Sequence, residues 1–231
     1  MALLSGDGWL FLLRWFHFLA GITWIGLLDY FNFVQTPFFA TAEAPVRTGM
    51  LSGGLVSRAL WWFRWAAMLT FLSGIAILGA RRASWSDPWG ITILTGAAFG
   101  TLMFLNVWLV IWPKQKVVIA SAVAAASGGQ ANPQAPAAAR RAFLASRTNV
   151  VMSFPMLFFM GAASHFTLNP VRNSGLYGGL LLLILALLEV NALAGSKGPT
   201  KQPIETVRGV IVSGVVTAAI VYFVAQAVLA G

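Results

Sequence analysis

The chain has 231 residues, of which 58% are hydrophobic and 9% are charged. A soluble domain carries about 25% charged residues, so this composition, with a mean hydropathy of +0.79, excludes an ordinary soluble protein and indicates an integral membrane protein. The sequence contains no cysteine, which excludes disulfides, iron–sulfur clusters, thiolate metal sites and a covalently attached c-type haem.

Several apolar stretches are long enough to cross a bilayer as helices. Because every backbone group inside hydrocarbon must be hydrogen-bonded within its own span, the predicted fold is all-α. We expect a polytopic transmembrane helix bundle that forms a single domain over residues 1–231. About six spans are predicted, at residues 9–35, 58–80, 90–112, 149–169, 174–195 and 207–230.

The distribution of basic residues predicts the orientation of the bundle. With the N-terminus outside, the following basic residues fall on the cytoplasmic side: Arg47, Arg58, Arg64, Lys114, Lys116, Arg140, Arg141, Arg147, Lys197, Lys201 and Arg208. Only Arg14, Arg81, Arg82 and Arg172 are left outside. The positive-inside rule favours this arrangement, so both termini are expected outside, in the periplasm or the extracellular space, and the protein in a cytoplasmic membrane. The net charge of +9 then reflects topology and attraction to membrane lipid, and no nucleic-acid partner is expected.

One connection differs from the short ones. Residues 113–148 are predicted to form a flexible cytoplasmic loop, partly helical, because the middle of the segment, at 120–139, is rich in Ala, Ser, Gly, Gln and Pro. Such a mixture has little power to bury a core. The segment is interpreted as a spacer on the membrane surface, with a docking segment for a partner as the alternative.

The two histidines of the chain each lie toward one end of an apolar run. His17 has Gly21 one helical turn deeper, and His165 has Gly161 in the same relation. Arg14 lies one turn further out than His17, where a haem propionate needs a cation. Polar groups inside hydrocarbon are costly and usually functional, so we predict a haem b whose iron is held by the two imidazoles on antiparallel spans.

Two alternatives to this haem site stay open. A histidine in a membrane helix also serves as a hydrogen-bonding partner for a neighbouring span, and glycine allows close helix packing. Methionine can supply an axial ligand in place of one histidine. The methionines available for that role are Met68, Met103, Met156 and Met160.

A second group of polar residues is expected at the cytoplasmic end of the bundle. Its predicted members are Asp29, Asn32, Gln35, Asn106, Lys114, Gln115, Arg147, Asn149 and Glu189. The carboxylates Asp29 and Glu189 are costly in a membrane unless paired, and Arg64 and Arg147 are the expected partners. The cluster suits a polar substrate, a quinone head group or protons. A purely structural network of ion pairs and amides is the alternative.

Three segments resemble a known family: LLRWFHFLAGITWIGLLDYFNFVQTPFF at 12–39, NVWLVIWPKQKVV at 106–118 and SRTNVVMSFPMLFFMGAASH at 146–165. They are similar to the membrane domain of bacterial membrane-bound urate hydroxylases, the urate oxidase N-terminal family. The resemblance implies oxidation of urate toward 5-hydroxyisourate, with electrons passed to the respiratory chain through a periplasmic cytochrome c. It also places His17 and His165 on the histidine motifs of the family.

The chain departs from this family in two respects. Trp61 and Ala66 stand where the resemblance implies a histidine and a glutamate, the groups suited to abstract a proton from a purine. The resemblance also implies a C-terminal cytochrome c domain, which we expect this protein to lack. We therefore predict an integral membrane haem b redox protein that hands electrons to a separate cytochrome c or the respiratory chain. The alternative is a non-catalytic accessory subunit of a larger respiratory or photosynthetic membrane complex. A transporter is a third reading.

Overall fold

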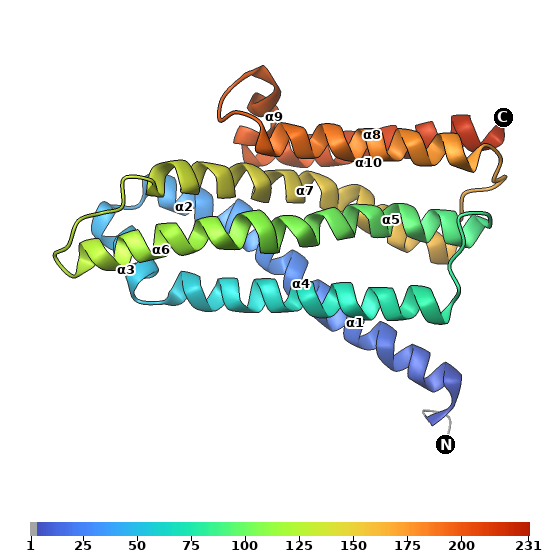
Figure 1. Cartoon of the computed structure of the whole chain (residues 1–231), viewed down its shortest axis with the longest axis horizontal. Helices are drawn as coiled ribbons and strands as arrows, with labels where there is room; N and C mark the ends of the chain where they lie inside the picture. Colours follow the sequence, from blue (N-terminus) through green and yellow to red (C-terminus); the bar gives the residue numbers. More distant parts are fainter. Residues whose placement is uncertain (1–3) are drawn as a thin grey trace.

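The protein is described by a computed structural model, which covers residues 4–231. Within those residues every regular element is helical and no strand occurs. Six of the described helices are long and apolar enough to cross a membrane, which confirms the predicted polytopic bundle. The start of α1 and the end of α10 lie at the same end of the molecule (Figure 1), as an even number of spans requires.

The helices follow one another with short connections. Their bounds are α1 (Gly6–Asp29), the π-helical η2 (Tyr30–Gln35), α2 (Thr36–Thr41), α3 (Ala44–Ser52), α4 (Leu55–Ala80), α5 (Pro88–Leu105), the π-helical η3 (Asn106–Ile111), α6 (Trp112–Ala126), α7 (Ala135–His165), α8 (Ser174–Leu193), the short 3-10 helix η4 (Pro199–Lys201), α9 (Gln202–Glu205) and α10 (Val207–Ala230). The end that carries α2, α3, the α6–α7 turn and α9 is called the basic end below, because the basic residues predicted as cytoplasmic lie on the elements gathered there.

Side-chain caps set the starts of two spans. Asp87 precedes α5, and its Oδ1 accepts a hydrogen bond from the backbone N–H of Gly90 at 2.8 Å. Thr206 precedes α10, and its Oγ1 accepts from the N–H of Gly209 at 3.0 Å. Such caps satisfy N–H groups that have no partner within the helix, and therefore mark where each helix begins. Both starts lie close to the predicted ones.

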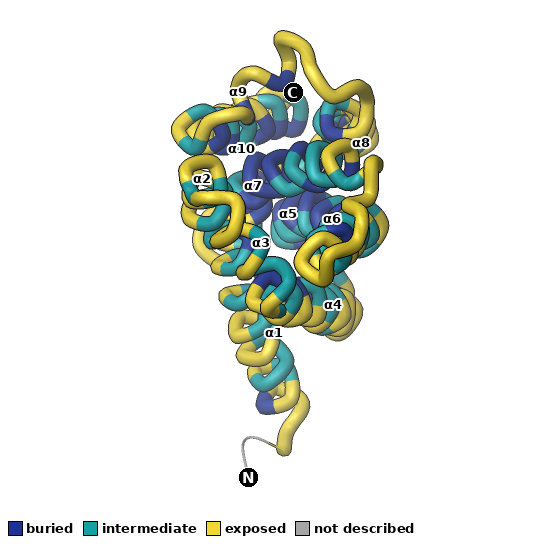
Figure 2. Tube along the Cα trace, turned by 90° about the vertical axis from the view of Figure 1, so that its left-hand side faces the viewer, coloured by how far each residue is buried: buried dark blue, intermediate teal, exposed yellow. Residues whose placement is uncertain are grey.

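Helix α7 is the centre of the bundle. In its apolar stretch 67% of the residues are buried, against 6% in the stretch that contains α1. Figure 2 shows the buried residues gathered on α7 and α5, with α1 at one edge of the molecule. Close packing needs small residues at the crossings. A Cβ on Gly96 of α5 would lie 3.0 Å from the carbonyl oxygen of Met156, so α5 rests almost directly on the backbone of α7.

The predicted flexible loop at 113–148 is wrong in its extent. Helix α6 continues to Ala126 and α7 begins at Ala135, so the connection between them is confined to residues 127–134. Gly128 adopts a φ of 79° just after α6, a conformation that ends helices and favours glycine. Alanine has the highest helix propensity, so the alanine-rich composition that suggested a loop instead forms two helices.

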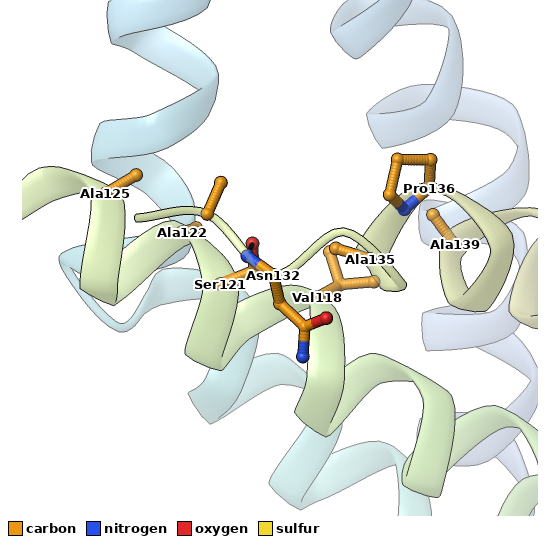
Figure 3. Close-up of a pocket in the computed structure, with 9 residues that line it drawn as sticks. Val118, Ser121, Ala122, Ala125, Asn132, Ala135, Pro136 and Ala139 are labelled. Atoms are coloured by element: carbon orange, nitrogen blue, oxygen red, sulfur yellow. Dashed lines mark hydrogen bonds between the residues drawn. The ribbon is translucent and has the colours of Figure 1, made fainter. Parts of the chain in front are cut away.

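The α6–α7 turn is closed by polar contacts and leaves a shallow groove. Ser121 Oγ accepts a hydrogen bond from the backbone N–H of Asn132 at 2.9 Å. Asn132 Oδ1 in turn accepts from the N–H of Gln134 at 2.8 Å. The small side chains of the two helices line a groove of about 360 Å³ beside this contact (Figure 3).

Candidate functional site

Two spans contain a π-helical segment near a proline. Pro37 follows η2 and Pro113 follows η3, each at the second position of the next helix. Proline has no N–H, and its ring clashes with the carbonyl four residues earlier, so an ordinary α-helical turn cannot run through it unchanged. In η2 the N–H of Thr36 bonds to the carbonyl of Phe31, five residues back, and η3 has the same offset. π-helical turns are frequent at functional sites.

A cavity of about 190 Å³ lies beside η2 at the basic end. Five polar side chains line it: Asn32, Gln35, Thr36, Gln115 and Ser146. The apolar part of the lining is Phe31, Phe39, Leu51, Val56, Leu60, Phe63, Ile111, Val118, Ala139, Ala142 and Phe143. The cavity therefore combines amides and hydroxyls with four phenylalanine rings, a lining suited to a planar ligand with polar edges.

Hydrogen bonds hold the polar wall of the cavity in place. Asn32 is 2% exposed, and its Nδ2 donates to the carbonyl of Leu28 and to Ser146 Oγ, both at 2.8 Å. This contact ties η2 to α7. Gln35 Oε1 is buried and has no hydrogen-bond partner. Because buried polar atoms are nearly always paired, this free acceptor is available to a ligand in the cavity.

A separate network of buried amides joins three spans. Asn106 Nδ2 donates to Asn149 Oδ1 at 3.0 Å and to Glu189 Oε2 at 2.9 Å. Asn149 Nδ2 donates to the carbonyl of Met103 at 3.0 Å. The predicted polar cluster thus divides into two groups, one that lines the cavity with Asn32, Gln35 and Gln115, and one that connects η3, α7 and α8.

The expected ion pairs do not form. Asp29 and Glu189 have no basic partner, since the ion pair that the described residues make is Arg140–Glu205. The guanidinium carbon of Arg64 lies 3.8 Å from the centre of the Trp112 ring, and that of Arg147 lies 5.1 Å from the Phe143 ring. Lys114 is exposed on α6 and does not line the cavity.

The two histidines lie in different surroundings. His17 Nδ1 is 3.0 Å from Ser73 Oγ on α4. The Ser73 hydroxyl also donates within α4, to the carbonyls of Leu69 at 2.6 Å and Thr70 at 3.1 Å. His165 is exposed at the end of α7. Figures 1 and 2 place α1 at the edge of the bundle beyond α4, and α7 at its centre.

The glycine one turn from His17 lies against α4, whereas the glycine one turn from His165 has open space beside it. A Cβ on Gly21 would meet Thr70 of α4 at 3.9 Å, whereas Gly161 has nothing within 4 Å. Arg14 is half-buried on α1. Neither histidine lines either of the two cavities described above. Haem ligation by His17 and His165 stays a prediction from the sequence.

The structure also places the methionines and the two positions where the chain departs from the family. Met156 and Met160 pack against glycines of α5. Trp61 is 46% exposed and Ala66 is 5% exposed, so of the two positions where the resemblance implies a histidine and a glutamate, the first is on the surface and the second is buried. Neither position lines the cavity.

Sequence reasoning missed several residues of the cavity. Ser146, Thr36 and the phenylalanines were not predicted as site residues, because a hydroxyl or an apolar ring in a membrane span carries little signal by itself. The sequence did contain one indication of the site, the prolines Pro37 and Pro113. A proline inside a long apolar run predicts a local disturbance of the helix, and both disturbed turns border the site.

Comparison with known proteins supports the resemblance seen in the sequence. Residues 85–225 match the family described as urate oxidase N-terminal. The match covers α5 through most of α10 and includes the segments at 106–118 and 146–165, while the segment at 12–39 lies outside it. No curated protein and no solved structure matches the chain. Because the family match spans more than half of its residues, the chain belongs to the urate oxidase N-terminal family.

Proposed function

We propose that the chain binds a planar polar heterocycle of the urate class in the cavity, as the membrane domain of an oxidoreductase of the urate hydroxylase type. The observation that carries the proposal is the lining of amides and phenylalanines. Each amide both donates and accepts, which matches the alternating N–H and C=O groups around a purine. Gln35 Oε1, buried and free, supplies an acceptor for a ring N–H.

The cavity contributes binding and orientation to the reaction. Its lining includes no acid, histidine, lysine or arginine, so no side chain in it abstracts a proton. Oxidation of urate with water gives 5-hydroxyisourate, two protons and two electrons. In this proposal the electrons pass to a separate redox partner, a cytochrome c or another carrier of the respiratory chain.

Urate binding to the purified full chain tests the proposal. We expect saturable binding in equilibrium dialysis with radiolabelled urate. Gln35→Leu and Gln115→Leu should each weaken it by about fivefold or more, since each removes a hydrogen bond worth about 1 kcal/mol. Gln130→Leu is the matched control, because Gln130 is exposed in the α6–α7 turn and should leave the affinity unchanged.

Two results would contradict the proposal. Equal affinities in all three variants would place the ligand outside the cavity. A protein that binds no urate but retains a short-chain quinone, with the same dependence on Gln35 and Gln115, would assign the cavity to a quinone head group and overturn the urate proposal.

Haem b ligation by His17 and His165 stays a prediction from the sequence. It is measured as the difference between the dithionite-reduced and the oxidised absorbance spectra of the purified protein. A b-type band that disappears in both His17→Ala and His165→Ala would support ligation by the two histidines. A colourless protein, or a band that survives in either variant, would contradict it.

A further inference from the structure

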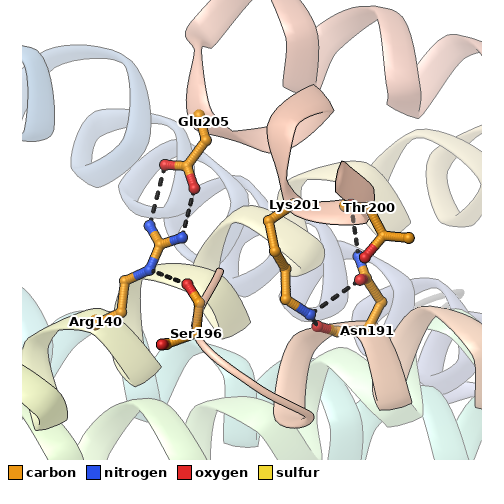
Figure 4. A network of polar contacts seen from close by, with 6 residues as sticks. All are labelled: Arg140, Asn191, Ser196, Thr200, Lys201 and Glu205. Carbon is orange, nitrogen blue, oxygen red and sulfur yellow. Dashed lines mark hydrogen bonds and ion pairs between the residues drawn. The ribbon is translucent and has the colours of Figure 1, made fainter. Parts of the chain in front are cut away.

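Four basic side chains gather where α7 meets the connection between α8 and α10. We call Arg140, Arg141, Arg147 and Lys201 the cation cluster. Figure 4 shows two of its members, Arg140 and Lys201, with their partners. Arg140, Arg141 and Arg147 lie on α7, and Lys201 lies in η4, on the connection between α8 and α10.

Backbone carbonyls satisfy part of the cluster. Arg140 Nε donates to the carbonyl of Ser196 at 2.9 Å, and Arg141 Nη1 donates to the carbonyl of Ala192 at 2.7 Å. Lys201 Nζ contacts the carbonyl of Asn191 and donates to its Oδ1 at 3.0 Å. These contacts position the cations but carry no negative charge, so they do not neutralise the cluster.

Among the residues that the structure describes, Glu205 is the carboxylate that pairs with this cluster. Both of its oxygens contact the guanidinium of Arg140. The hydrogen bond from Arg140 lowers the pKa of Glu205, and the charges of Arg140 and Arg147 lower it further. Burial lowers the pKa of Lys201, and the charges of Arg141 and Arg140 act in the same direction. The members therefore lie close enough to interact, and the cluster carries a surplus of positive charge.

Arg147 is the member whose charge is least compensated. It is 2% exposed, and its buried Nε and Nη1 have no hydrogen-bond partner. A buried, unpaired charge destabilises a protein strongly. An arginine with free donors in a cationic surrounding is suited to a phosphate group, because the planar guanidinium presents parallel N–H groups to two of its oxygens.

We infer that the cation cluster binds a phosphate group, supplied by an anionic phospholipid. The end of α8 and the start of α10 mark the level of the lipid head groups at the basic end. The phosphate would add the negative charge that Glu205 alone does not provide. Anionic lipid is attracted to basic residues at the membrane surface, and the buried Arg147 would give this attraction a defined site.

Native mass spectrometry of the purified full chain tests the inference with added phosphatidylglycerol or phosphatidylcholine. We expect retained phosphatidylglycerol on the wild type and much less phosphatidylcholine. Arg147→Gln should reduce retention by about fivefold or more, since a basic residue near anionic lipid contributes about that factor. Arg147→Lys should keep part of it. Arg58→Gln is the control, because Arg58 is an exposed arginine at the same end.

A second variant is expected to increase lipid retention instead of lowering it. Glu205→Gln removes the carboxylate that competes with phosphate for Arg140, so retention should rise. Glu43→Gln removes an exposed carboxylate at the basic end and should have no effect. If Arg147→Gln does not fold, Lys201→Gln replaces it and should also lower retention.

Three results would overturn the inference. One is equal retention of both lipids, and another is an equal loss in Arg58→Gln, which would indicate diffuse attraction. The third is no change in Glu205→Gln. A measurement with inorganic phosphate distinguishes a lipid head group from free phosphate. If free phosphate binds as tightly as the lipid, the cluster is a phosphate site whose ligand comes from solution, and the lipid assignment is wrong.

Discussion

Replacing Asn106 by leucine is expected to lower the free energy of unfolding by about 2–5 kcal/mol, because two acceptors lose their donor. Asn106 is 1% exposed, and its amide serves Asn149 Oδ1 and Glu189 Oε2 together. Leucine has the same branching and number of side-chain heavy atoms as asparagine, so the change leaves no cavity and the polar loss dominates. Thermal unfolding followed by the fluorescence of the ten tryptophans measures the effect.

A double-mutant cycle identifies the source of that loss. Glu189→Leu removes one of the two acceptors, so Asn106→Leu should cost less in that background than in the wild type. Gln130→Leu is the control, because Gln130 is an exposed amide in the α6–α7 turn. Equal costs in both backgrounds would mean that the Asn106–Glu189 contact does not contribute to stability.

The membrane spans were predictable because each depends on local sequence alone. Length and hydropathy identify a span without reference to its neighbours, and the predicted 207–230 is the observed α10. The segment at 113–148 was misread because its alanines were taken as weak core formers. Their high helix propensity, together with packing of α6 against α7, decides the outcome.

The polar contacts were only partly predictable, for a physical reason. A sequence gives the depth of a residue in a span and its face on the helix, but not which helix lies beside that face. Asn106, Asn149 and Glu189 were expected in one cluster and do contact one another. Arg147 was expected to pair with a carboxylate, yet it lies on the Phe143 side of α7 without an ionic partner.

The same reason explains the histidines. Depth places His17 and His165 in the same half of the bundle. Their lateral positions depend on the packing order, which puts α1 against α4 and α7 at the centre (Figure 2). Ser73, the partner of His17, lies on α4, the next span along the chain, and no pattern in the sequence singled out its hydroxyl as that partner.

Gly96→Leu is expected to destabilise the bundle by about 3 kcal/mol, at the upper end of the range for overpacking. A Cβ at Gly96 would lie 3.0 Å from the carbonyl oxygen of Met156 and 3.2 Å from the backbone nitrogen of Met160. Both atoms belong to the backbone of the central helix α7, which cannot turn aside as a side chain can. The added side chain must therefore push α5 away from α7.

Gly179→Leu is the matched control, because it replaces a glycine by leucine at a position with free space. Gly179 lies on α8 with nothing within 4 Å of an added Cβ, so the higher helix propensity of leucine should raise stability by up to about 1 kcal/mol. The two variants thus have opposite expected signs in the same thermal unfolding measurement. Trimming Met160 to alanine in the Gly96→Leu variant should restore little, since the closest atoms belong to the backbone. Full recovery on trimming would show that the Met160 side chain, and not the α7 backbone, limits how closely α5 approaches.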